Sequence, residues 1–120
     1  ASSYKQAIMG DNIVYNYLGG VSTQWLTTLA PNAIKQGNDF VNGVSSDLTT
    51  TSRVANQQVL ISMIHTTSTG ISSRISQDRA ITTRSWQGNY QELIVYPTDQ
   101  TSNLTAIDSN INTHYSIYTP

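Results

Sequence analysis

The sequence predicts a small, mainly helical domain centred on a long helix or a helical hairpin between residues 44 and 86. Three observations favour this fold class. This stretch has no proline and a single glycine, and both residue types disfavour helix interiors. Ser45 or Ser46 can cap a helix at its start, and Asp47 complements the positive end of the helix dipole. Aliphatic residues then recur with a period near 3.5, which keeps most of them near one helix face: Val44, Leu48, Val54, Ile61, Ile64, Ile71 and Ile75.

An all-β sandwich is the alternative fold. Residues 66–70, Thr-Thr-Ser-Thr-Gly, are poor helix formers and suit the turn of a helical hairpin. Residues 59–64 are almost all apolar and partly β-branched, so they also suit a buried strand. The alternative places strands near residues 13–18, 54–64, 71–76, 90–96 and 112–118.

Shorter elements are expected on both sides of this centre. Residues 21–29 carry apolar side chains at helical spacing, and residues 103–111 predict a short helix that Asp99 or Ser102 can cap. Asn42-Gly43 marks a turn. Short extended pieces are expected at residues 13–18, 91–96 and 113–118. A length of 120 residues suits one domain, so we expect residues 1–120 to fold as a single unit.

The surface chemistry is unusual because the chain is polar without being charged. About 50 of its 120 residues are Ser, Thr, Asn or Gln, and only 11% are charged, whereas soluble domains have about a quarter of charged residues. The net charge of −1 gives copies of the chain little mutual repulsion. Hydrophobic residues make up 38%, and cysteine is absent, so disulfides cannot compensate for a thin core.

This composition favours a non-enzymatic structural or assembly subunit that acts outside the cytoplasm, in a secretion apparatus, a surface filament or a virus particle. The start at Ala1-Ser2-Ser3 fits the end left by signal-peptide cleavage, and removal of an initiator Met would leave the same start. No apolar run is long enough to span a bilayer. We expect the partners to be further copies or other protein subunits. The predicted interface residues are Ile61, Ile64, Ile71, Ile75, Tyr115 and Tyr118.

An extracellular binding module is the alternative function. Trp25 and Trp86 offer large aromatic surfaces that could recognise a glycan or a protein. The competing interpretation makes both tryptophans members of the core. A stable monomer with exposed aromatic rings would favour the binding module.

Catalytic, metal and cofactor sites are not expected. The carboxylates are scattered singly, and His65 and His114 lack the close spacing of metal ligands. A small hydrolase that uses either histidine is the third hypothesis.

Nucleic acid is excluded as a partner, because the arginines form no stripe on a helix. Residues 53–84 hold four arginines and one acid, Asp78, whereas every charged residue from 85 onward is an acid. This asymmetry could steer head-to-tail contacts between copies, and the favoured interpretation is internal ion pairs or scattered surface charge.

One tripeptide has a family resemblance. Trp86-Gln87-Gly88 follows a proline-free segment rich in Ser and Thr, and it resembles the signature turn of the small secreted helical-hairpin proteins named after their Trp-x-Gly motif. In that family the turn lies between two long helices. Here only about 32 residues follow it and Pro97 interrupts them, so we do not assign the chain to that family.

Overall fold

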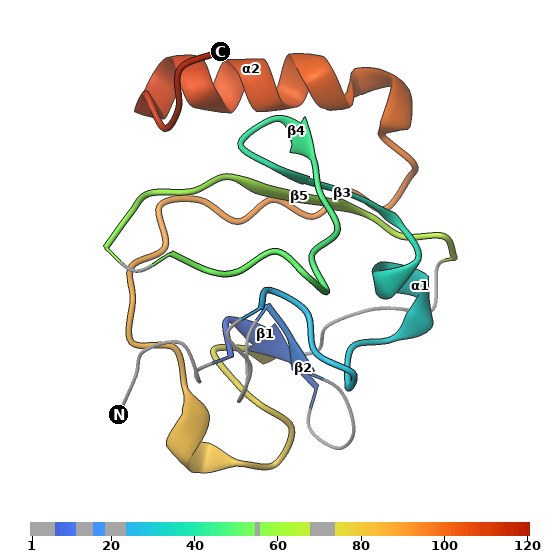
Figure 1. Ribbon diagram of the computed structural model, residues 1–120, viewed down its shortest axis with the longest axis vertical. Helices are drawn as coiled ribbons and strands as arrows, with labels where there is room; N and C mark the ends of the chain where they lie inside the picture. The colour runs from blue at the N-terminus through green and yellow to red at the C-terminus, as the bar shows by residue number, and fades with distance from the viewer. Residues whose placement is uncertain (1–6, 12–15, 19–23, 55, 68–73) are drawn as a thin grey trace.

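The structure is a computed structural model that describes residues 7–11, 16–18, 24–54, 56–67 and 74–120. Within these residues the chain forms short strands and helices (Figure 1). The strands are β1 (Met9–Gly10), β2 (Asn16–Tyr17), β3 (Asn38–Val41), β4 (Val44–Ser45), β5 (Ile61–Ile64) and β6 (Arg74–Ile75). The helices are α1 (Asn32–Lys35), the 3-10 turns η2 (Thr82–Arg84) and η3 (Thr101–Asn103), and α2 (Leu104–Tyr115). The strands form two three-stranded antiparallel sheets, ordered β2-β1-β6 and β4-β3-β5.

The prediction of a mainly helical fold is wrong. Residues 44–86 contain β4, β5, β6 and η2, and no α-helix in the part that the structure describes. The Asp47 carboxylate accepts the Thr49 N–H at 2.9 Å, and Thr51 N–H donates to the Asp47 carbonyl at 2.8 Å, which closes a single turn. Threonine hydroxyls also bond the backbone there, and such bonds compete with helix continuation. The fold is therefore closer to the all-β alternative.

A tight hairpin joins β3 to β4. Asn42 and Gly43 have φ values of 52° and 76°, as a two-residue type I′ turn requires, so the predicted turn is present. Asn42 also extends the pairing with the chain before β5, because its N–H donates to the Leu60 carbonyl and its Oδ1 accepts the Leu60 N–H, both at 2.9 Å. β3 is consequently the central strand of its sheet.

The sheet β4-β3-β5 is covered on both faces. Val41 of β3 and its partner Ile61 of β5 pack against the buried core. Side chains alternate along a strand, so Phe40 and its partner Ser62 lie on the opposite face, where Ser62 Oγ donates to Asp108 of α2 at 2.7 Å. Figure 1 shows α2 lying across this side of the sheet. Within the described ranges, the buried core contains Leu18, Trp25, Leu26, Ala30, Ile34 and Leu48.

A buried carboxylate organises the chain after β6. Asp78 is fully buried, and it forms ion pairs with Arg79 at 2.8 Å and with Arg84 at 3.0 Å. Ala7 N–H donates to the Arg84 carbonyl at 3.0 Å, which fastens this loop beside β1. Arg79 and Arg84 are thus paired inside the chain with an acid of their own stretch, residues 53–84, and not with the acids that follow residue 85.

The C-terminal helix is the best-predicted element. The helix expected at residues 103–111 is present as α2, and the Asp99 carboxylate accepts the Thr101 N–H at 2.8 Å where η3 begins. The extended piece expected at residues 113–118 is wrong, because the helix continues to Tyr115. The buried Asn112 side chain then holds the chain end, with bonds of 2.8 and 2.9 Å to the backbone of Tyr118.

The helix expected at residues 21–29 is also not formed in its described part, residues 24–29. Trp25 N–H donates to the Thr51 carbonyl at 3.2 Å, and Leu26 N–H donates to the Leu48 carbonyl at 2.9 Å. These pairings with a distant turn replace the local bonds of a helix. Of the strand expected at residues 13–18, the structure describes Asn16 and Tyr17 of β2, and residues 12–15 lie outside the described part.

Replacing a core leucine tests this arrangement. Leu48 is fully buried, so Leu48→Ala should lower the free energy of unfolding by about 2–5 kcal/mol. The measurement is urea denaturation followed by circular dichroism. Val44→Ala is the control, because Val44 is 65% exposed and its truncation should change stability by less than about 0.5 kcal/mol. Equal effects of the two substitutions would contradict the burial of Leu48 in the core.

Candidate interaction surface

The most unusual surface feature is a run of four large apolar residues exposed to solvent. Leu93, Ile94, Val95 and Tyr96 are 43%, 43%, 74% and 45% exposed. Single exposed apolar side chains are normal, whereas contiguous apolar surface marks an interaction site or an aggregation-prone site. We call residues 93–96 the apolar segment.

The chain just before the apolar segment is fastened to the rest of the molecule by three side chains. Tyr90 Oη donates to the Ile8 carbonyl beside β1 at 2.6 Å. Gln91 Oε1 accepts from Gln58 Nε2, next to the residues that lead into β5. Glu92 is hydrogen-bonded to Tyr115 of α2, and this contact, after burial, raises the pKa of Tyr115.

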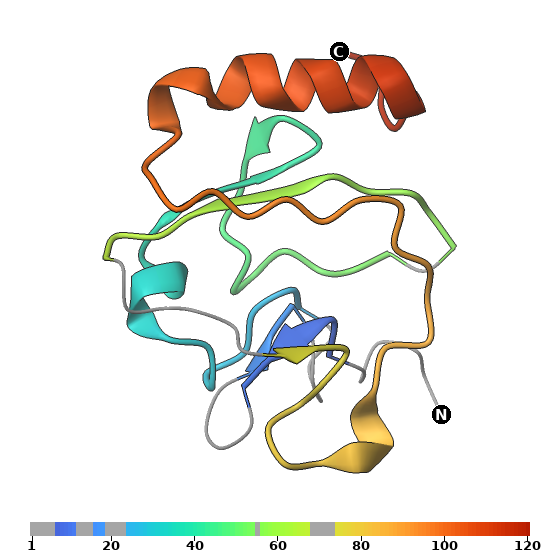
Figure 2. The same cartoon turned by 180° about the vertical axis from the view of Figure 1, so that it is seen from behind.

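The far end of the apolar segment is fixed by Pro97 and by the Asp99 turn that starts η3. Between these attachments the chain runs extended across the molecule, without an assigned strand (Figures 1 and 2). Among the described residues, no hydrogen bond uses a backbone N–H or C=O of residues 91–98. An extended chain with open backbone groups is a template for strand pairing. The extended piece expected at residues 91–96 is therefore present as an unpaired chain.

A second feature is a buried acid in the central strand. Asp39 is only 5% exposed, and its Oδ1 is buried without a hydrogen-bond partner. Burial first, and then the nearby charge of Asp47, raise the pKa of Asp39 to about 7. The pKa of Asp47 moves the opposite way, because Thr49 donates hydrogen bonds to its carboxylate. Asp39 is thus a neutral acid in the folded chain at mildly acidic pH.

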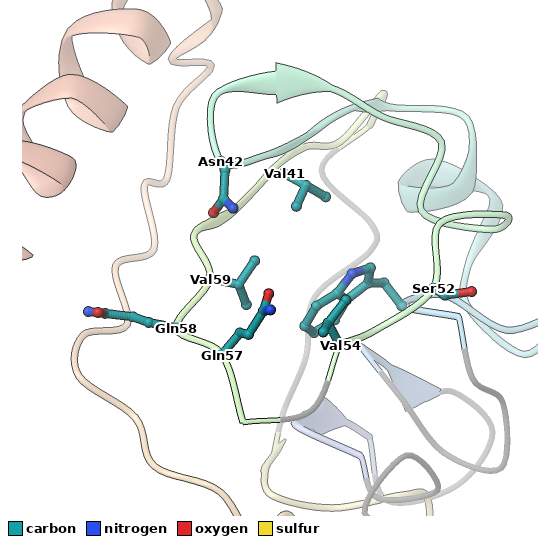
Figure 3. A pocket seen from close by; sticks show the side chains of 8 residues that line it. Val41, Asn42, Ser52, Val54, Gln57, Gln58 and Val59 are labelled. Atoms are coloured by element: carbon teal, nitrogen blue, oxygen red, sulfur yellow. The ribbon is translucent and has the colours of Figure 1, made fainter. Parts of the chain in front are cut away.

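A small hollow lies beside Trp25. It measures about 80 Å³, and Figure 3 shows it lined by valines and amide side chains. The Gln58 side chain points away from it, toward Gln91. Ligand pockets hold about 300–1,000 Å³, so this hollow is too small for a sugar or a cofactor. Its lining residues are Trp25, Val41, Asn42, Ser52, Val54, Gln57, Gln58 and Val59.

The predicted isoleucine interface is not one surface in this fold. Ile61 packs against the core, and Ile64, three residues along the same strand, points to the opposite face. Ile75 lies in the other sheet and is 57% exposed. Ile71 lies outside the described residues.

The predicted tyrosines and tryptophans make contacts inside the chain. Tyr115 bonds Glu92, and Tyr118 lies so close to Gly43 that a Cβ there would come within 2.8 Å of its hydroxyl oxygen. Trp25 is 5% exposed and belongs to the core. Trp86 is half-buried, and its backbone N–H donates to Ser76 Oγ at 2.8 Å. A role of any of them toward a partner stays a prediction.

The two histidines lie apart in the fold. His65 follows β5 and is half-buried, and its burial lowers its pKa. His114 is on α2, where its ring meets Tyr115 edge-on at 4.5 Å between centroids. Within the described ranges, no three His, Asp or Glu residues come together in a way that could hold a metal ion.

Sequence reasoning missed the apolar segment as a surface. A signal was present, since an unbroken apolar run stands between Glu92 and Pro97, and charges and prolines commonly flank aggregation-prone strands. The long-range contacts of Tyr90 and Gln91, which hold the run at the surface, have no local signature.

No protein-family model matches the chain, and no curated protein or solved structure matches it either. For the part of the chain that is described, no helix has the length and apolar character needed to cross a membrane.

The titration of Asp39 predicts how stability depends on pH. Its pKa is about 7 in the folded chain and has the ordinary value of 3.8 when unfolded. Between these two values the folded state binds more protons, so the free energy of unfolding contributed by this group falls as the pH rises and is lowest above pH 7.

Asp39→Asn replaces the acid with a neutral side chain of similar shape. It should stabilise the protein by a few kcal/mol at pH 8 and leave stability nearly unchanged below pH 4, as measured by urea denaturation across this pH range. Asp99→Asn is the control, since Asp99 is exposed and its pKa is lowered by Thr101, so it should not stabilise the protein at pH 8. If the free energy of unfolding of the variant ran parallel to that of the parent protein across this pH range, the titration of a buried Asp39 would be ruled out.

Proposed function

We propose that this chain is a non-enzymatic structural subunit that acts by associating with other protein subunits, and first of all with copies of itself. The single observation that carries the proposal is the apolar segment, with four consecutive large side chains that are each at least 43% exposed. Removing such surface from water is favourable by about 25 cal/mol per Å². In the isolated chain these side chains stay in water, so this free energy is gained only when a partner covers them.

The charge distribution supports a partner that is also uncharged at the contact. Residues 93–96 carry no charge, and Glu92 beside them is bonded to Tyr115. Interface centres are depleted of charged side chains and enriched in aromatic ones such as Tyr96. The net charge of −1 opposes the approach of a second copy only weakly.

The proposed setting is outside the cytoplasm, in a secretion apparatus, a surface filament or a virus particle. It rests on composition, because the surface is wetted by hydroxyls and amides and only 11% of the residues are charged. The alternative of an aromatic binding module receives less support, since Trp25 is buried and the hollow beside it is too small for a sugar.

Sedimentation velocity tests the proposal. The weight-average sedimentation coefficient should rise as the protein concentration goes from micromolar to millimolar. Because the contact is apolar, ammonium sulfate should strengthen the association, whereas a contact between charges would be weakened by salt. A monomer at every concentration, with and without sulfate, would refute self-association.

A further inference from the structure

We infer that the apolar segment pairs with the same segment of a second copy, as two antiparallel strands about a twofold axis that passes beside Ile94. This inference rests on the proposed function and gives it a partner and a geometry. The occupant is a second copy of the chain, and the contact is a β-ladder over residues 92–96.

The backbone is ready for strand addition. Residues 92–96 run across the molecule without a turn or bend (Figures 1 and 2), and no hydrogen bond among the described residues engages the backbone N–H and C=O groups of residues 91–98. Tyr90 and Gln91 hold one end, and the Asp99 turn holds the other. Little conformational freedom is then left to lose on pairing, which favours association. Strand addition supplies main-chain hydrogen bonds and places side chains opposite one another.

Symmetry restricts the register. Residues that face each other in an antiparallel pair point to the same side of the sheet. A twofold axis that relates two neighbouring strands is perpendicular to the sheet and leaves that side unchanged. Facing residues must therefore be an even number of positions apart, so one residue must face its own copy.

Chemistry selects Ile94 as that residue. Centred there, Ile94 faces Ile94 and Leu93 faces Val95, so the aliphatic side chains meet only each other. Glu92 faces Tyr96, whose hydroxyl is a donor that suits a carboxylate. The two Glu92 carboxylates lie at opposite ends of the ladder. Pro97, which has no N–H, falls just outside it.

The neighbouring registers are poorer. Centring on Val95 sets Leu93 opposite Pro97 and interrupts the ladder. Centring on Leu93 sets Glu92 opposite Ile94, so a carboxylate from each copy enters the apolar centre, where an unpaired charge is unfavourable. Charge complementarity and the position of the proline thus favour pairing about Ile94.

Single-cysteine cross-linking tests the register directly, because the chain has no cysteine of its own. Facing residues of an antiparallel pair have Cα atoms about 4.5–5.5 Å apart, within the range of a disulfide. Under mild oxidation Ile94→Cys should form a covalent dimer about tenfold faster than Val95→Cys, which faces Leu93 instead. Val44→Cys, on an exposed residue of β4, is the control for random collision.

A mixture of Leu93→Cys and Val95→Cys is the companion experiment, and it remains usable if Ile94→Cys folds poorly. The mixture should cross-link faster than either variant alone. Equal rates for Ile94→Cys, Val95→Cys and Val44→Cys, together with no gain in the mixture, would overturn the pairing.

The sedimentation series separates the two ways of failing. A parent protein that associates while its cysteine variants show no preference would refute the strand pair and leave the assembly function standing. A parent protein that stays monomeric throughout would refute both. Preferential cross-linking at Ile94 in a protein that associates would support both.

Discussion

The fold depends on the central strand β3. Its backbone pairs with β4 on one side and β5 on the other, so no strand of this sheet is held independently of it. One of its faces meets the core through Val41, and the other lies toward α2, which Asp108 fastens to the neighbouring Ser62. Asp39 lies on the same face of β3 as Val41, toward the core, which is why it is enclosed and resists ionisation.

The core is thin, and buried polar side chains hold several separate segments of the chain in place. Asp78 closes the loop after β6, Asp108 fastens α2, and Asn112 holds the chain end, and each has hydrogen-bond partners inside the chain. Buried polar groups stabilise a fold only when they are satisfied, and satisfied groups favour one arrangement over others. Asp39, with its unpartnered oxygen, departs from this pattern.

Sequence patterns predicted correctly those elements that depend on neighbouring residues alone. The Asn42-Gly43 turn and the α2 helix behind Asp99 were expected from the sequence, and both are present. The prediction of a helix over residues 44–86 was wrong. A spacing of three places Ile61 and Ile64 on the same face of a helix but on opposite faces of a strand. Pairing with β3, which lies some twenty residues away in the sequence, decides between the two. The exposure of the apolar segment likewise depends on distant contacts, those of Tyr90 and Gln91.

The strength of the proposed pairing follows from how much apolar surface remains open. Fully burying one such side chain is worth about 1.5–3 kcal/mol, and those of the apolar segment are already roughly half covered, so each contributes on the order of 1 kcal/mol. Two copies together gain at most about 8 kcal/mol, because pairing at an edge covers only the flank of each side chain that faces the partner, against the roughly 4–15 kcal/mol lost in translational and rotational freedom. A single pair is therefore weak and reversible. Copies already held close together lose far less freedom, so the same ladder becomes effective inside an assembly, which is where a subunit of this kind needs it.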